Sequence, residues 1–296
     1  MYTKITNLFG GIFLENFGAT YKKIRKSRCI TQESVCQNLI SRTTLSKFEN
    51  NKLVPSITVF FKLLDRIDIS MDEFIYIGKN YQISKKKELV NNFFSIFTNK
   101  SIEDLNSLHQ QCINFLKENE SKTIELLIWV IESLVELSSN DNKKIPCLPK
   151  VMLSIPWENL QQYSAWSLDD IKIINCCLYM FPFDVAMNIS TQLINQLLKY
   201  EKLQDLFLLQ SAIYLNVTLL CLQNGETEKG KSYVELAIQK SKKSKRYDYF
   251  SLATARKGFL YNREILIDQA LDMSRLFEDT ELQQLILEEK ELYLTT

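Results

Sequence analysis

Apolar residues recur every three or four positions along most of the chain, which is the spacing of one face of an α-helix. Leu215, Leu219 and Leu222 form one such run, and similar runs precede and follow it. The 296 residues include only 7 glycines and 5 prolines, so few positions interrupt the pattern. The sequence therefore predicts an all-α protein.

Residues 18–77 are expected to form five short helices. Four of these helices have, at or directly before their first residue, a serine or threonine that can accept a hydrogen bond from the first turn: Thr31, Ser41, Ser56 and Ser70. The third helix ends at two asparagines, and we expect Asn51 in the left-handed conformation that glycine usually adopts there. The expected helices span 18–27, 31–38, 42–49, 56–67 and 70–77.

A polar, basic stretch at 78–87 is the predicted linker between two domains. The remainder, 88–296, is expected to be a helical-repeat domain that serves regulation and dimerisation. Its least helical part, Asn140 to Pro156, contains three prolines and is expected to be a long loop. The expected helices lie near 84–97, 101–118, 121–138, 149–163, 168–180, 183–199, 203–223, 227–243, 248–261, 265–276 and 279–293.

The helices of the second domain are expected to pack as antiparallel pairs. One pair, between Tyr214 and Ala237, has small residues, including Thr218 and Gly230, where two helices must approach closely. This spacing resembles a tetratricopeptide repeat, and no other pair repeats it cleanly. We therefore expect an α-solenoid of degenerate tetratricopeptide-like repeats.

The first 17 residues differ from the rest. Gly10 and Gly11 break any helix, and no charge pattern indicates a nucleic-acid-binding arm. Residues 1–17 are interpreted as an N-terminal extension. One hypothesis is that translation starts at Leu14 rather than Met1, which the intact mass of the protein from its native host would decide.

The net charge of +1 is unevenly distributed. Residues 18–62 hold nine Lys and Arg residues against two Asp and Glu residues, a local charge of +7. Residues 81–296 carry a charge of −4. A compact basic segment joined to an acidic body favours a polyanionic partner at one end only.

Candidate catalytic and metal-binding groups are sparse. His109 is the single histidine, and the seven cysteines are scattered without a C-x-x-C pair. We expect buried or half-buried thiols in a reducing cytoplasm, no metal, no cofactor and no enzymatic activity. No run of 18 uncharged apolar residues indicates a membrane span, and the N-terminus lacks an export signature, so a cytoplasmic location is expected.

The segment 18–77 resembles the XRE family of phage-repressor-like helix-turn-helix domains. The resemblance implies that Gln32 contacts a phosphate or an outer base and that Arg25 pairs with Glu49 as a structural element. A recognition helix then presents its polar N-terminal end to bases in the major groove. The candidates for base contact are Arg42, Thr43 and Lys47, and those for phosphate contact are Lys22, Arg28 and Lys52. Thr44 is a further candidate for DNA contact.

The runs 45–49, 60–67 and 70–74, together with the long helical tail, resemble Rgg/MutR-type regulators. That resemblance implies a cytoplasmic transcription factor whose repeat domain binds a short peptide pheromone. On the inner face of the predicted repeat, the candidates for contacting a short hydrophobic peptide are Leu215, Asn216, Leu219, Gln223 and Arg256. The same leucines could instead be core, and Arg256 could be an ordinary surface charge.

The leading hypothesis is a peptide-controlled regulator that binds double-stranded DNA sequence-specifically as a homodimer. A second hypothesis keeps the DNA binding and makes the tail a ligand-independent dimerisation domain. A third is a peptide-regulated protein-interaction module. The sequence does not identify the operator, the peptide, or the helices of the dimer interface.

Overall fold

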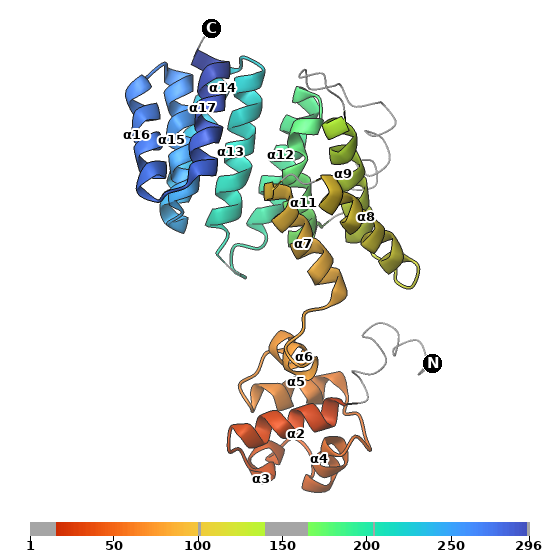
Figure 1. Ribbon diagram of the computed structural model, residues 1–296. Coiled ribbons are helices and arrows are strands. Elements are labelled where there is room, and N and C mark those ends of the chain that lie inside the picture. The colour runs from red at the N-terminus through yellow and green to blue at the C-terminus, as the bar shows by residue number, and fades with distance from the viewer. Residues whose placement is uncertain (1–15, 100–101, 140–164, 204, 295–296) are drawn as a thin grey trace. The chain divides into compact units, whose positions relative to one another are not determined.

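The computed structural model describes residues 16–99, 102–139, 165–203 and 205–294. The chain divides into two compact units, Met1–Glu88 and Leu89–Thr296. Within the described ranges, all regular structure is helical and no strand is present. The all-α prediction is therefore confirmed (Figure 1). No helix in these ranges is both long enough and apolar enough to cross a membrane.

The first unit contains five helices in its described part, as the sequence predicted. They are α2 (Phe17–Ser27), α3 (Gln32–Cys36), α4 (Arg42–Glu49), α5 (Ile57–Asp65) and α6 (Met71–Gly78). The observed α3 and α5 are shorter than expected, because their last predicted residues form turns rather than helix.

All four predicted N-caps of the first unit are present. The hydroxyls of Thr31, Ser41, Ser56 and Ser70 each accept a hydrogen bond from a backbone N–H three residues later. The Glu73 carboxylate also accepts from the Ser70 backbone, which completes a capping box at α6. These local bonds explain why the helix starts could be read from the sequence.

α2 and α4 approach each other unusually closely at Gly18. A Cβ atom on Gly18 would lie 1.7 Å from the Phe48 carbonyl oxygen, so no other residue fits there without moving a helix. Asn51 has φ 57°, the predicted left-handed conformation, and its side-chain oxygen accepts from the Ala19 N–H at 3.1 Å. The end of α4 therefore caps the start of α2.

The core of the first unit includes one residue that the sequence analysis placed in the N-terminal extension. Phe17 stacks on Phe60 with ring centroids 5.5 Å apart and meets Phe74 edge-on at 5.2 Å. The extension therefore ends before Phe17 rather than after it. The proposed alternative start at Leu14 and the pair Gly10-Gly11 lie outside the described residues.

The second unit is a succession of helices joined by short turns. The helix expected near 149–163 and most of the loop expected from Asn140 lie outside the described residues. α7 begins at Lys85, so the last residues of the predicted linker 78–87 are helical. The helices are α7 (Lys85–Asn99), α8 (Ile102–Leu116), α9 (Lys122–Ser139), α11 (Leu168–Cys176), the 3₁₀ turn Leu178–Met180, α12 (Phe183–Leu198), α13 (Phe207–Gln223), α14 (Thr227–Ser244), α15 (Tyr247–Tyr261), α16 (Glu264–Leu276) and α17 (Thr280–Leu294).

Helices α13 to α16 form two consecutive hairpins that stack side by side (Figure 1). Thr218 is fully buried between helices, and a Cβ on Gly230 would lie 2.8 Å from Leu260 of α15. Small residues at these two positions let α13, α14 and α15 pack closely, as the repeat pattern predicted. The fold class, a helix-turn-helix unit followed by a tetratricopeptide-like stack, is confirmed.

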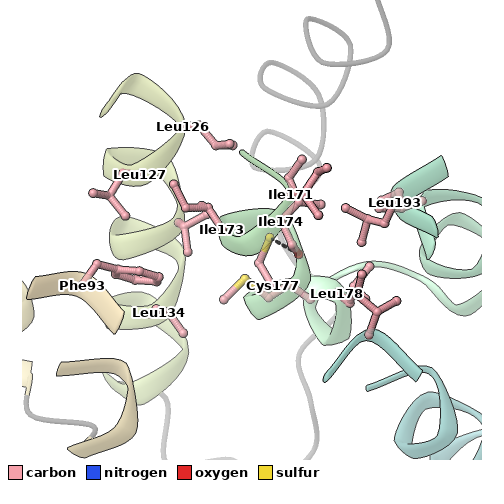
Figure 2. Close-up of a cluster of buried hydrophobic side chains, with 14 of the residues drawn as sticks. Phe93, Leu126, Leu127, Leu134, Ile171, Ile173, Ile174, Cys177, Leu178 and Leu193 are labelled. Atoms are coloured by element: carbon pink, nitrogen blue, oxygen red, sulfur yellow. Dashed lines mark hydrogen bonds between the residues drawn. The ribbon is translucent and has the colours of Figure 1, made fainter. Parts of the chain in front are cut away.

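The first half of the second unit is held by an apolar core shown in Figure 2. Side chains from α9 and α11, among them Leu127 and Ile173, point toward one another and exclude water. Cys177 lies in the same core, and its Sγ donates to the Ile174 carbonyl oxygen at 3.2 Å. Burial raises the pKa of the neighbouring Cys176 thiol to about 12. The prediction of buried thiols holds here but is wrong for Cys29, which is exposed.

Candidate nucleic-acid interface

The helix-turn-helix is formed by α3, the turn at 37–41 and α4. Leu45 and Phe48 are buried and fix α4 against the rest of the unit. The opposite side of the helix exposes Arg42, Thr43 and Lys47, the residues predicted to contact bases. This arrangement follows from helical spacing, because residues three or four apart share a face. The exposed end of α4 therefore combines the Arg42 guanidinium with the Thr43 hydroxyl, and Lys47 follows in the last turn of the helix.

Beneath this surface lies the predicted Arg25–Glu49 ion pair. Arg25 Nε donates to Glu49 Oε1 at 2.6 Å, and a second nitrogen donates to Oε2 at 3.0 Å. Both side chains are buried, and hydrogen bonding to Glu49 raises the pKa of Arg25. Arg25 also donates to the Ile30 carbonyl oxygen, which fixes the turn before α3. The pair therefore joins α2, α3 and α4.

Gln32 links the buried pair to the exposed surface, a role that the sequence analysis did not assign. Its Nε2 donates to Glu49 Oε2 at 2.8 Å, and its Oε1 accepts from Arg42 Nε at 3.5 Å. The side chain is half-buried. Glu49 lies 17 positions away from Gln32, so no local spacing rule could have indicated this contact.

Two other predicted DNA contacts have partners within the protein. The Thr44 hydroxyl lies 2.8 Å from the Ser41 hydroxyl, so it takes part in the cap of α4. Lys22 Nζ donates to Asn50 Oδ1 at 2.9 Å, which ties α2 to the end of α4. Arg28 and Lys52 are exposed, and no ion pair involves either residue in the described part of the chain.

The residues predicted to bind a peptide do not form one open surface. Leu215 is only 3% exposed and Arg256 only 4%. Arg256 is held in a buried pair with Glu289 of α17, with Nε–Oε2 at 2.9 Å, and it donates to the Leu215 carbonyl oxygen at 2.8 Å. The predictions that Leu215 lines a groove and that Arg256 is free for a peptide carboxylate are therefore wrong.

The other three candidates remain accessible to differing degrees. Asn216 and Leu219 are half-buried and Gln223 is exposed. The Asn216 amide donates to the carbonyl oxygen of Asn175 at 2.9 Å, which links α13 to α11. None of these residues lines the separate pocket of about 570 Å³ between α12 and α14. That pocket is lined by Phe183, Asp184, Met187, Asn188, Lys229, Ser232 and Tyr233.

Comparisons with known proteins agree with this geometry. Residues 22–74 match the helix-turn-helix family. No curated protein matched the sequence.

Solved structures share the fold of nearly the whole chain at low identity. A candidate transcriptional regulator of Listeria monocytogenes EGD-e has a TM-score of 0.76 and 16% identity, over 95% of this chain and 98% of that one. The SHP pheromone receptor Rgg2 of Streptococcus dysgalactiae has a TM-score of 0.67 and 12% identity, over 93% and 99%. PlcR of Bacillus thuringiensis, with the peptide PapR7 and DNA, has a TM-score of 0.65 and 16% identity, over 92% and 99%. Residues 22–74 therefore form a helix-turn-helix domain, and the chain has the fold that these proteins share.

Proposed function

We propose that the protein is a transcriptional regulator that binds double-stranded DNA sequence-specifically through the exposed end of α4. The observation that carries this proposal is the connection of that end to a buried ion pair. Arg42 is linked through Gln32 to Glu49 and Arg25, so the reading surface rests on a fixed support. A preorganised surface loses less conformational entropy when it binds.

Each exposed side chain has a chemical role in this proposal. The Arg42 guanidinium can donate two parallel hydrogen bonds to guanine O6 and N7, and the Thr43 methyl group can contact thymine. Such a bidentate contact contributes about 1–3 kcal/mol of discrimination between bases. Lys47, Arg28 and Lys52 suit phosphate or groove contacts that raise affinity for any sequence.

The test begins with selection of bound duplexes from a random library by the full-length protein. The variant Arg42→Ala/Thr43→Ala/Lys47→Ala is then measured against the selected duplex and a scrambled one by fluorescence anisotropy. We expect the variant to lose most of its preference for the selected sequence. All three side chains are exposed, so the fold should persist, and circular dichroism should confirm this.

A matched control removes two cations from the second unit through Lys117→Ala/Lys199→Ala. Both residues are exposed and lie outside the helix-turn-helix. We expect the control to keep the selectivity of the parent protein. Failure to select any sequence, or selectivity unchanged in the α4 variant, would show that α4 does not read DNA.

The finer part of the proposal is control by a short hydrophobic peptide bound in the second unit. The supporting observation is the shared fold, because PlcR was solved with both a peptide and DNA. ComR of Streptococcus thermophilus, with a TM-score of 0.59 and 15% identity, was also solved with DNA and its signalling peptide. In this chain, Asn216, Leu219 and Gln223 are the accessible candidates for peptide contact.

Isothermal titration of the full-length protein with short hydrophobic peptides encoded near its gene tests peptide control. We expect one peptide to bind and to change the affinity of the protein for the selected duplex. Because coupling between two ligands is reciprocal, the duplex should change the affinity for the peptide by the same factor. DNA binding that no such peptide alters would leave a ligand-independent regulator.

Sedimentation with and without duplex tests the proposed homodimer.

A further inference from the structure

Five cations crowd the corner where α14 ends and α15 begins. We call this set, formed by Lys240, Lys242, Lys243, Lys245 and Arg246, the basic corner. All except the half-buried Lys240 are exposed. The ion pairs of the described residues include one at this corner, between Arg246 and Asp248. The four lysines therefore have no salt-bridge partner in that part of the chain, although residues 81–296 are acidic overall.

Aromatic rings hold several of these lysines in place. The Nζ atoms of Lys240 and Lys243 lie 5.6 and 5.2 Å from the centre of the Phe207 ring. Lys242 Nζ lies 5.2 Å from the centre of the Phe250 ring. A cation over an aromatic face is attracted by the ring, so these side chains lose part of their freedom before any partner binds. The corner is thus a partly preorganised group of charges.

Helix capping accounts for only part of this cluster. Lys242 and Lys243 lie in the last turn of α14, where cations interact favourably with the helix dipole. Lys245 lies beyond the helix in a left-handed conformation, with φ 54°. The pKa of Lys240 is lowered by burial and by the charge of Lys243, while Glu201 opposes the shift. Interaction with the helix end therefore explains Lys242 and Lys243 but not the other cations of the basic corner.

We propose that the basic corner binds the phosphate backbone of a nucleic-acid duplex, as an electrostatic contact additional to α4. The proposal rests on the proposed function, because a duplex held by the first unit would raise the local phosphate concentration at the second. The lysine ammonium is a compact charge that suits phosphate contacts without sequence choice.

The test measures binding of the full-length protein to a mixed-sequence duplex of about 40 base pairs by anisotropy, between about 50 and 200 mM salt. The variant Lys242→Gln/Lys243→Gln/Lys245→Asn removes three exposed charges, and asparagine suits the left-handed position of Lys245. The slope of log affinity against log salt is negative, and each lost phosphate contact makes it shallower by about 0.9, so we expect its magnitude to fall by about 2.7.

Two further variants separate charge from damage to the fold. Lys117→Gln/Lys122→Gln/Lys229→Gln removes three exposed lysines elsewhere in the second unit and should keep the parent slope. Lys242→Arg/Lys243→Arg preserves the charge of the corner and should also keep it. The single change Lys243→Gln should reduce the magnitude of the slope by about 0.9. Equal slopes in the parent protein, the triple corner variant and the triple control would overturn the proposal.

The experiments also distinguish a nucleic-acid duplex from an acidic polypeptide at the basic corner, and failure of this proposal from failure of the proposed function. Poly-L-glutamate that binds the parent as tightly as the duplex, and loses that binding in the corner variant, would assign the corner to an acidic polypeptide instead. If the parent binds duplex and the α4 variant loses selectivity, the proposed function stands whatever the corner variant does. If the parent binds no duplex at any salt concentration, both proposals fail together.

Discussion

Replacing Gly18 with alanine should separate the two helices that support the reading surface. The added Cβ would lie 1.7 Å from the Phe48 carbonyl oxygen, whereas Cβ atoms essentially never approach closer than 3.0 Å. α2 and α4 must therefore move apart by more than an ångström. Overpacking of this kind costs about 1–3 kcal/mol. Loss of the Asn51 cap on Ala19 adds about 1 kcal/mol, so we expect the first unit to lose about 2–4 kcal/mol.

The loss is large on the scale of the unit. A domain of this size has an unfolding free energy of roughly 4–10 kcal/mol. All three tryptophans, at positions 129, 157 and 166, lie in the second unit, so their fluorescence does not report on the first. Amide hydrogen exchange followed by mass spectrometry resolves the two units. Peptides from α2 and α4 should exchange roughly 30- to 700-fold faster in the variant.

A control and a refuting outcome complete this experiment. Ala19→Ser adds an atom at the exposed neighbouring position and should change stability by less than about 0.5 kcal/mol. Peptides from the second unit should exchange at parent rates in both variants. If the α4 amides of Gly18→Ala exchange within about threefold of the parent rate, the two helices accommodate a side chain at this position. The close approach of α2 and α4 would then not be a constraint on residue 18.

Three further predictions address stability, pH and thiol chemistry. Arg256→Leu should lower the free energy of unfolding of the second unit by about 3–5 kcal/mol, because Glu289 stays buried without its partner; urea unfolding followed by tryptophan fluorescence measures this. The double variant Arg256→Leu/Glu289→Leu should recover part of that loss, and a double variant no more stable than Arg256→Leu would contradict this explanation. Hydrogen bonds from Ser70 lower the pKa of Glu73, so the capping box should stabilise α6 above the ordinary carboxyl pKa of 4.5 and weaken as pH falls. Equal exchange of α6 amides in the parent and in Glu73→Ala at neutral pH would contradict this. At pH 8, iodoacetamide should modify exposed Cys29 well before Cys221, whose pKa burial raises to about 11; equal modification rates, measured by peptide mass, would refute this.

Local rules explain why most of the fold could be predicted from the sequence. The starts of the first unit's helices depend on hydroxyl caps and on apolar spacing within a few residues, and both can be read along the chain. The left-handed Asn51 follows from the same local logic. The membership of Phe17 in the core was less predictable, because it depends on contacts with α5 and α6.

The candidate peptide contacts in the second unit were predicted less well, because residues distant in the sequence determine whether these side chains are buried. Leu215 lies on an apolar stripe, and spacing cannot show whether a stripe faces a groove or a neighbouring helix. α13 is packed on several sides, so Leu215 is buried. Arg256 is paired with Glu289, which lies 33 residues further along the chain. One signal was available: Ala253, Ala255 and Phe259 surround Arg256 in the sequence, and such neighbours are typical of a buried helix face.

The network around Gln32 connects the stability of the first unit to the geometry of the proposed base contact. The Glu49 carboxylate accepts from Arg25 and from the Gln32 amide nitrogen, so the amide oxygen of Gln32 is left to face Arg42. That oxygen accepts from Arg42 Nε, whereas a guanine is recognised by the two terminal nitrogens of the guanidinium. Arg42 can therefore be oriented by the protein and contact a base at the same time. Substitutions that weaken the buried Arg25–Glu49 pair should therefore also reduce base selectivity, because Gln32 links that pair to Arg42. This effect is expected even where every exposed side chain of α4 is unchanged.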